Sequence, residues 1–344
     1  MNTRLIWILF AVAVSVAFGY SNSVQLVYPA HFPTPVYDLQ ANPLTTSKIE
    51  LGRALFYDPI LSKDNTISCA SCHSPYNAFA HTDHALSHGI NDQIGTRNAP
   101  ALFNLAWQKS FMWDGAVHHL DMQALAPISS TLEMGEDIAN IVQKLQQKSL
   151  YPLLFEQAFG DSTVTGQHIL QALAQFQLTL VSATAKYDKV QQGLDSFSLQ
   201  EQAGKQVFES HCNSCHSAPL FMNNEFANNG LKVDSSLQDF GKWLVSQQTK
   251  DSLLFRVPSL RNLSYSYPYM HDGRFQKLRQ VIDHYTQLDT TSTLLDVRLQ
   301  QSIDLTNRQK TDLIAFLLTL NDPQFVFNPD NKFPRAILLP TGNE

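Results

Sequence analysis

The sequence predicts a mainly α-helical protein with long loops, in which two similar halves follow one another. Apolar residues recur at helical spacing over residues 167–183, and shorter helical patterns cover 138–150, 279–285 and 311–320. Alternating runs of the kind that form strands are scarce, and stretches rich in Ser, Asn, Asp and Gly, such as 223–239, are typical of loops. With so much of its length in loops, the chain is expected to wrap around something other than its own apolar core.

The first residues have the pattern of an export signal. Met1 to Arg4 carries a positive charge and no acidic residue, and an apolar run of about 14 residues follows, from Leu5 to Phe18. The run suits the core of a signal peptide and is short for a membrane span, which needs about 20 residues. We therefore predict a cleaved signal peptide over residues 1–19 and an exported, soluble mature protein. An uncleaved membrane anchor is the alternative.

Three landmarks occur twice along the chain in the same order, which indicates a duplicated domain. The paired segments are 50–56 with 201–208, 97–102 with 258–262, and 111–115 with 269–273. The polar stretch 186–198 is the predicted linker between the two copies. The predicted organisation is an N-terminal extension over 20–45, a first domain over 46–190, a second domain over 198–325 and a C-terminal tail over 326–344.

The composition excludes several classes of protein. Hydrophobic residues make up 44% of the 344-residue chain and charged residues 16%, which is neither a disordered nor a fibrous composition. The 24 Lys and Arg against 30 Asp and Glu give a net charge of −6, so we expect no nucleic-acid partner, because nucleic acids require a basic surface. Four cysteines are too few for a disulfide-rich scaffold.

The four cysteines form two Cys-x-x-Cys-His motifs, which are the attachment signature of c-type haem. In such a motif two thiols bind the vinyl groups of one haem, and the adjoining histidine becomes an axial ligand of the iron. A thioredoxin-like pair would need a βαβ setting, and a four-cysteine zinc site would have to join motifs that lie far apart in the sequence. We therefore predict two covalent c-type haems. The residues that would hold them are Cys69, Cys72 and His73 for the first haem, and Cys212, Cys215 and His216 for the second.

The residues alone leave the second axial ligand of each iron open. Loop histidines after the first motif could each reach the first iron or be solvated: His81, His84 and His88. The candidates for the second iron are Met222, Met270, His271 and Tyr285. A methionine would raise the reduction potential of the iron, whereas a tyrosinate would stabilise its ferric form.

Several short segments occur together in one known family. They are Leu51–Asp58, both Cys-x-x-Cys-His motifs, Arg97–Pro100, Trp113–Gly115, Glu133–Met134, Pro258–Asn262 and Pro268–Gly273. In this combination the chain resembles the bacterial di-haem cytochrome c peroxidase and MauG family, from about Asn42 to about Asp322. The family implies two mainly helical, cytochrome c-like domains, each wrapped around one haem. The N-terminal haem would meet hydrogen peroxide, and the C-terminal haem would pass electrons.

The resemblance implies catalytic roles for four residues of the first domain. Trp113 lies where the family has a tryptophan between the haems, as an electron relay. Gln123 and Glu133 match the family's distal glutamine and catalytic glutamate, and Pro127 matches a proline that lines the same pocket. Splitting the O–O bond of peroxide requires a proton to move between its oxygens, which a carboxylate can carry. Without the resemblance, Glu133 would be interpreted as a solvated acid and Trp113 as a core residue.

The resemblance also implies a calcium ion at the domain junction, with Asn98 and the carbonyl groups of Ser266 and Pro268 as its ligands. Tyr285 departs from the plain peroxidases, which generally have a methionine ligand at this distance after the histidine that is His271 here. A tyrosine at this position is similar to the MauG branch, whose members oxidise residues of a partner protein.

The sequence therefore predicts a periplasmic di-haem peroxidase that reduces hydrogen peroxide to water. Electrons would come from a small donor protein, a cytochrome c or a cupredoxin, and would enter at the C-terminal haem. The alternative is a MauG-like enzyme that takes electrons from a protein substrate. A non-enzymatic electron carrier is a further alternative, but it would not need the pocket residues Gln123 and Glu133. A homodimer is compatible with each of these.

Overall fold

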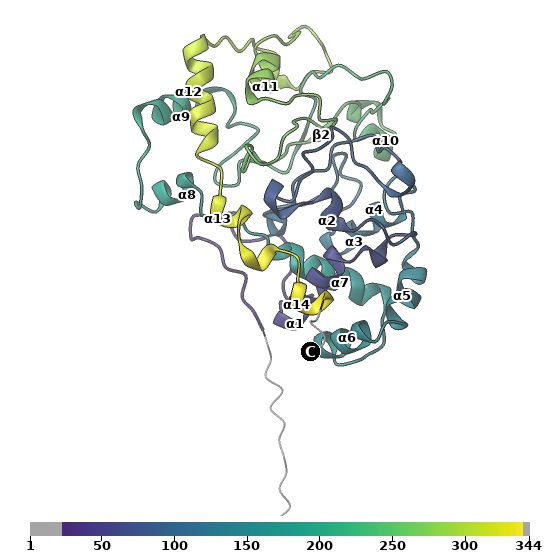
Figure 1. Ribbon diagram of the computed structural model, residues 1–344. Coiled ribbons are helices and arrows are strands. Elements are labelled where there is room, and N and C mark those ends of the chain that lie inside the picture. Colours follow the sequence, from purple (N-terminus) through teal and green to yellow (C-terminus); the bar gives the residue numbers. More distant parts are fainter. Residues whose placement is uncertain (1–22, 340–344) are drawn as a thin grey trace, which may run out of the picture.

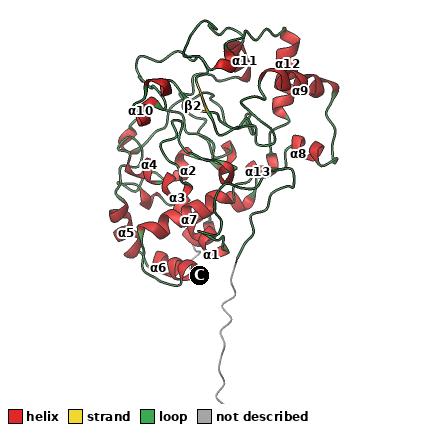
Figure 2. Ribbon diagram, turned by 180° about the vertical axis from the view of Figure 1, so that it is seen from behind, coloured by secondary structure: helices red, strands yellow, loops and turns green. Residues whose placement is uncertain are grey.

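The computed structural model describes residues 23–339, and the fold is mainly helical, as predicted (Figure 2). The predicted signal peptide lies outside the described residues. The helices are α1 (Thr46–Tyr57), α2 (Cys69–Cys72), α3 (Leu120–Gln123), α4 (Leu125–Ser129), α5 (Ile138–Gln146), α6 (Leu150–Phe159), α7 (Gly166–Leu178), α8 (Lys186–Gln191), α9 (Leu199–His211), α10 (Trp243–Ser246), α11 (Leu278–Tyr285), α12 (Asn307–Leu318), α13 (Pro323–Val326) and α14 (Arg335–Leu338). Strands β1 (Phe226–Ala227) and β2 (Phe255–Arg256) form one antiparallel pair. Most of the remaining chain is loop.

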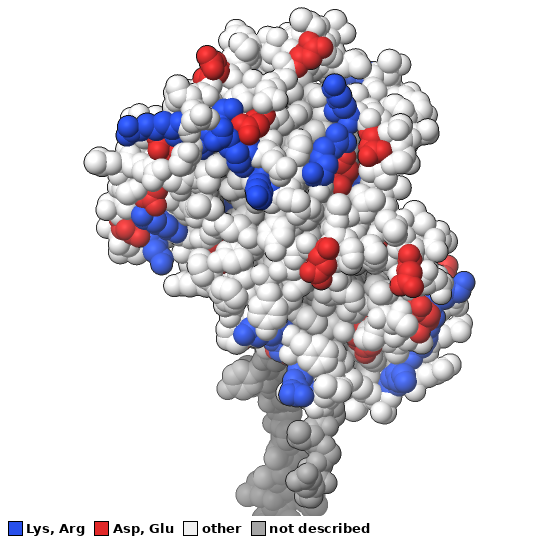
Figure 3. Space-filling view, turned by 45° about the horizontal axis from the view of Figure 1, so that its top comes forward, with Lys and Arg blue, Asp and Glu red and all other residues white. Residues whose placement is uncertain are grey.

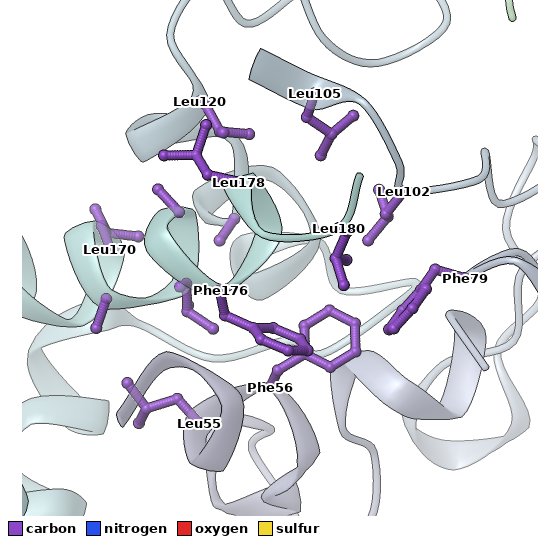
Figure 4. Close-up of a cluster of buried hydrophobic side chains, with 14 of the residues drawn as sticks. Leu55, Phe56, Phe79, Leu102, Leu105, Leu120, Leu170, Phe176, Leu178 and Leu180 are labelled. Atoms are coloured by element: carbon purple, nitrogen blue, oxygen red, sulfur yellow. The ribbon is translucent and has the colours of Figure 1, made fainter. Parts of the chain in front are cut away.

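The helix pair α1 and α7 forms the centre of the first half. Thr45 caps α1 by accepting a hydrogen bond from the backbone of Lys48, and Gly52 lets the two helices approach closely. A Cβ atom on Gly52 would lie 1.9 Å from the carbonyl oxygen of Ala172 in α7. One turn further along, the rings of Phe56 and Phe176 pack edge to face, 5.2 Å apart (Figure 4).

The helix pair α9 and α12 repeats this arrangement in the second half. A Cβ atom on Gly204 would lie 1.8 Å from the carbonyl oxygen of Asp312, and the rings of Phe208 and Phe316 are 5.2 Å apart. The glycine and the phenylalanine are four residues apart in α1 and in α9 alike, so they lie on one face of each helix. The duplication inferred from the sequence is therefore present in the packing of these two helix pairs.

Buried apolar side chains form two clusters rather than one. The larger cluster contains residues of α1 and α7, and the smaller contains residues of α9, α11 and α12. Figure 1 shows α9, α11 and α12 at one end of the molecule and α1, α6 and α7 at the other. The C-terminal segment returns from α12 to the first half, where Tyr57 donates a hydrogen bond to the carbonyl oxygen of Asn331 at 2.5 Å.

The prediction of a polar linker over residues 186–198 is only partly correct, because α8 occupies its first part. Within α8, Asp188 is fully buried and forms an ion pair with the fully buried Arg261 at 2.7 Å. The ring of His31, from the N-terminal extension, lies 3.0 Å from the same carboxylate. A buried carboxylate is tolerated here because its charge and its hydrogen-bonding capacity are both satisfied.

The repeated turns 111–117 and 269–275 share one backbone conformation. The first turn is closed by a hydrogen bond from Phe111 N to the oxygen of Val117, and the second by one from Tyr269 N to the oxygen of Phe275, both at 2.7 Å. The second and fifth residues of each turn have positive φ angles. Trp113 and His271 are therefore structurally equivalent.

No helix within residues 23–339 is long and apolar enough to cross a membrane.

The close approach of α1 and α7 predicts that Gly52→Ala destabilises the protein. The added methyl group must push the Ala172 backbone away, and overpacking of this kind costs about 2–3 kcal/mol. Urea unfolding of the holoprotein measures the loss. Gly166→Ala in α7 is the matched control, because its Cβ would meet only the flexible side chain of Ile138, at 3.0 Å. Equal stability of the two variants would contradict the contact.

Candidate haem sites and the junction between them

The first Cys-x-x-Cys-His motif is pre-arranged by local structure. Cys69 and Cys72 begin and end the single turn of α2, and His73 caps it with a backbone hydrogen bond to Cys69. The ring nitrogen Nδ1 of His73 lies 2.7 Å from the carbonyl oxygen of Phe79. Donation of the Nδ1 proton to this carbonyl leaves Nε2 with a free lone pair, the form in which histidine binds a metal. Burial lowers the pKa of His73 to about 4, which also favours the neutral ring.

The second motif has the same arrangement. Cys212 follows directly after α9, the backbone N–H of His216 donates to the carbonyl oxygen of Cys212, and His216 Nδ1 lies 3.0 Å from the carbonyl oxygen of Pro258. Burial lowers the pKa of His216 to about 4 as well. Each motif therefore presents one oriented imidazole and two free thiols. This is the donor set that covalent haem attachment requires.

In the part of the chain that the structure describes, no group of three or more His, Cys, Asp or Glu side chains is arranged to hold a metal ion. Burial raises the pKa of Cys69 and of Cys212 to about 12.

One cavity opens beside the second motif, and three of the four candidate ligands named from the sequence line it. Cys212, Cys215 and His216 line it together with Met270, His271 and Tyr285. Met222 packs instead in the larger apolar cluster, so it was wrongly considered a candidate. The ring of His271 stacks on Phe255, 3.8 Å between centroids. Burial raises the pKa of Tyr285 to about 12.

The residues predicted for peroxide chemistry lie on neighbouring elements, and Glu133 among them interacts with Cys72 of the first motif. Gln123 ends α3 and its amide nitrogen is 3.8 Å from Met112 Sδ, while Pro127 is within α4. Glu133 follows in the next turn, where its Oε1 accepts a hydrogen bond of 3.3 Å from the Ser87 hydroxyl. Burial raises the pKa of Glu133, and the Ser87 hydrogen bond opposes that rise. Glu133 is therefore not the solvated acid that its sequence context alone indicates.

The three loop histidines gather into one cluster. The rings of His84 and His88 stack with 4.1 Å between centroids, and the His81 ring lies 5.5 Å from that of His84. His81 is 8% exposed, and its Nδ1 is buried without a hydrogen-bond partner. A buried nitrogen without a hydrogen-bond partner costs free energy of folding. The histidine cluster is therefore suited to lie against a group bound at the first motif.

Trp113 lies at the junction between the two halves. Its indole Nε1 donates a hydrogen bond of 2.8 Å to the carbonyl oxygen of Asn98. The backbone N–H of Asn98 in turn donates a hydrogen bond of 2.7 Å to the carbonyl oxygen of His271. Trp113 and His271, equivalent in their turns, are thus joined through one residue. Arg97 fixes the same junction by ion pairs of 2.6 Å to Asp114 and to Asp239.

The three residues expected to bind calcium line the same cavity as Trp113: Asn98, Ser266 and Pro268. The Asn98 amide donates a hydrogen bond of 2.9 Å to the carbonyl oxygen of Ala85, so its own oxygen faces another direction. Oxygen atoms of an amide and of backbone carbonyls are suitable calcium ligands. The sequence analysis did not single out Ser87 or Asp239, because each acts through a contact with a residue distant in sequence.

Comparison with known proteins agrees with this donor chemistry. The family model described as di-haem cytochrome c peroxidase matches residues 46–196. The methylamine utilization protein MauG of Methylophilus methylotrophus is 38% identical over 301 residues, which cover 85% of this chain and 87% of that protein. The cytochrome c551 peroxidase of Nitrosomonas europaea is 32% identical over 319 residues, covering 90% of this chain and 89% of that protein.

Among solved structures, a MauG-like protein associated with microbial copper homeostasis superposes with a TM-score of 0.83 at 29% identity. The match covers 91% of this chain and 99% of that one. Both named branches of the family are thus similar to this chain over most of its length. The chain belongs to the di-haem cytochrome c peroxidase family, and it is a peroxide-using oxidoreductase with two c-type haems.

Proposed function

We propose that the protein is an exported di-haem peroxidase that reduces hydrogen peroxide to water. The observation that carries this proposal is the partly buried carboxylate of Glu133 near the first Cys-x-x-Cys-His motif, with its pKa raised by burial. Its charge also raises the pKa of Cys72, which supports their proximity. Burial makes the protonated form of this carboxylate more accessible, which suits a group that takes up and releases a proton during the reaction.

The reaction consumes one hydrogen peroxide, two electrons and two protons and yields two water molecules. Cys69, Cys72 and His73 would hold a c-type haem, which would supply the redox-active iron that this reaction needs. Glu133 Oε accepts a proton from one peroxide oxygen and returns it to the other, which then leaves as water. The amide of Gln123 orients the peroxide by hydrogen bonding, and Pro127 restricts the pocket.

Electrons enter at the His216 site, cross near Trp113 and reach the His73 site. The hydrogen bonds that link Trp113 through Asn98 to His271 support this route, because they form a short connected path between the halves. The donor is a small redox protein, a cytochrome c or a cupredoxin. On the face shown in Figure 3, acidic and basic side chains are interspersed between larger uncharged areas. Such a surface suits a partner that binds transiently. A partner that binds through strong charge complementarity would need a patch of one sign.

The second candidate function is a MauG-like oxidation of residues in a partner protein. Tyr285 favours it, because this phenol lines the cavity of the second motif where the plain peroxidases generally have a methionine. The similarity to proteins named MauG also supports it. A non-enzymatic carrier is disfavoured by the buried Glu133.

The remaining proposals concern the setting of the enzyme. The signal peptide over residues 1–19 directs it to the periplasm, where c-type haem attachment takes place. Two domains, 46–190 and 198–325, would hold one haem each, and the helix pairs α1 with α7 and α9 with α12 support that division. Asn98, Ser266 and Pro268 would hold a calcium ion at the junction. A homodimer is compatible with this arrangement.

Replacement of Glu133 by Gln tests the peroxidase proposal. The amide keeps the size of the side chain but cannot accept the proton, so peroxide turnover should fall by about 10²–10⁴-fold. Turnover is measured with reduced cytochrome c or an artificial donor, and haem content by the pyridine haemochrome assay. Haem content should match the wild type. Unchanged turnover would remove Glu133 from the mechanism.

Replacement of Tyr285 by Phe tests the ligand assignment at the second site. If the phenolate binds the second iron, the absorption and EPR signals of that haem change while those of the first haem stay constant. Met270 is a competing candidate ligand in the same cavity. If Tyr285 is the ligand, Met270→Leu should leave the spectra unaltered. Constant spectra in Y285F would show that Tyr285 only packs beside the haem.

One equivalent of hydrogen peroxide, added to the oxidised protein without a donor, distinguishes the two enzymes. The peroxidase proposal predicts that the absorption spectrum stays constant until one electron per protein is supplied, if a loop histidine caps the first iron at rest. A change within the mixing time would instead favour the MauG-like function. His88→Ala should then convert the first behaviour into the second if His88 is that cap.

A further inference from the structure

A hairpin over residues 87–97 contains the loop histidine His88 and contacts Glu133. Its backbone is fixed by hydrogen bonds from Ser87 N to the oxygen of Arg97 (3.0 Å), from Gly95 N to the oxygen of Ser87 (2.8 Å) and from Gly89 N to the oxygen of Gln93 (2.9 Å). This ladder sets the position of the Ser87 side chain, because a hairpin register determines which face each residue occupies.

The hairpin contacts both the backbone and the side chain of Glu133. The backbone N–H of Ile90 donates a hydrogen bond of 2.8 Å to the Glu133 carbonyl oxygen, and the Ser87 hydroxyl donates one of 3.3 Å to its carboxylate. The same hairpin contacts the first motif, where Cys72 Sγ lies 3.4 Å from the carbonyl oxygen of His88. The backbone and the side chain of Glu133 are therefore placed, relative to Cys72, by one element.

The Ser87 hydroxyl is confined to the orientation that serves Glu133. Ser87 is 5% exposed. Gly95 leaves just the room that the hydroxyl needs, since a Cβ atom on Gly95 would lie 2.1 Å from Ser87 Oγ. Neither solvent nor an alternative rotamer on the Gly95 side is freely available to the hydroxyl, so its hydrogen bond to the carboxylate is preorganised.

We propose that Ser87 is the positioning residue of Glu133: its hydroxyl fixes the carboxylate beside the first Cys-x-x-Cys-His motif and stabilises the charged, proton-accepting form. The inference rests on the proposed role of Glu133. A charge-stabilising hydrogen bond from a buried serine counteracts the effect of burial. Ser87 thereby keeps a share of Glu133 ionised at the pH where it must accept a proton.

Few other ionisable groups face this carboxylate. Cys72, whose thiol pKa Glu133 raises, is the group of the first motif that interacts with it. On its own segment, Glu136 is paired with Lys144 at 2.6 Å. The His88 ring of the hairpin stacks on another histidine of its loop. Ser87 is thus the side chain best placed to set the proton affinity of Glu133.

Ser87→Ala is the direct test, in the haem-loaded protein. Loss of the hydrogen bond raises the pKa of Glu133 further, because the hydrogen bond from Ser87 opposes the effect of burial. Because the ionised carboxylate is the active form, the acidic limb of the pH profile for peroxide turnover moves to higher pH. The maximal turnover should fall roughly tenfold, less than for loss of the carboxylate itself. The artificial donor ABTS serves as the electron source.

A readout independent of turnover is the carboxyl C=O band of Glu133 in infrared spectra, identified by its absence in E133Q. Its titration gives the pKa of Glu133 directly, and S87A should shift it upward. Ser87→Thr keeps the hydroxyl and should retain the wild-type pKa.

Gly95→Ala provides a second route to the same change without removing the hydroxyl. Its methyl group displaces Ser87 Oγ, so the Glu133 pKa and the pH profile should shift in the direction seen for S87A. In S87A/G95A the clash with the hydroxyl is absent, and the double variant should behave like S87A alone. Haem content and urea unfolding monitor the stability of each variant. The agreement between S87A and S87A/G95A would still test the contact if G95A alone lost stability.

Ser110→Ala is the matched control, because Ser110 is also 5% exposed but lies outside the hairpin. Its pH profile and its Glu133 titration should match the wild type. The inference is overturned if S87A leaves both unchanged, or if S110A shifts them equally. If E133Q itself retains full turnover, the proposed function of Glu133 fails instead, while the infrared titration still tests its contact with Ser87.

Discussion

Asn98 holds together the parts of the molecule that the proposed reaction needs, and it does so with three hydrogen bonds. Its carbonyl oxygen orients the Trp113 indole, its backbone N–H binds His271 in the second half, and its amide binds the carbonyl oxygen of Ala85. Asn98 is buried, so each unmade bond would cost about 1–3 kcal/mol. Arg97, next to it, adds two ion pairs across the same junction. These two consecutive residues act together with other contacts between the halves, such as the hydrogen bond of 2.8 Å from the Arg256 backbone N–H to the carbonyl oxygen of Trp113.

Much of the fold could be predicted because its determinants are local. Helix α11 matches the predicted range at both ends to within one residue, whereas α7 ends at Leu178, before the predicted position 183, and α12 begins at Asn307, before the predicted position 311. The glycines of the two helix crossings recur at equivalent positions in the repeated segments. Helix α8 was assigned to a linker because its polar sequence gives no sign of burial. Asp188 is buried only because Arg261, distant in sequence, neutralises it. Such long-range compensation leaves no periodic pattern.

The candidate site, like the fold, could be predicted where its determinants are local in the sequence. The Cys-x-x-Cys-His motifs specify their own chemistry, since two thiols and a histidine must lie on one helical turn. Met222 was considered a ligand because of its residue type, whereas its packing in the first apolar cluster depends on the tertiary fold. Glu133 required a family resemblance, and its contact with Ser87 required the structure. Residue identity thus indicates what a side chain can do, and only the fold determines what it faces.

The duplication gives the histidines of the two motifs the same surroundings. A difference between the two sites must therefore come from the other residues near each motif. Both motif histidines donate Nδ1–H to a backbone carbonyl and have pKa values lowered to about 4. Near the first motif lies Glu133, a carboxylate whose raised pKa suits proton exchange. Beside the second lies Tyr285, a buried phenol in the cavity that the second motif lines. Under the proposed function, the first site would couple electron transfer to proton transfer through Glu133, and the second would pass electrons. Peroxide reduction through two haems requires such a division of roles.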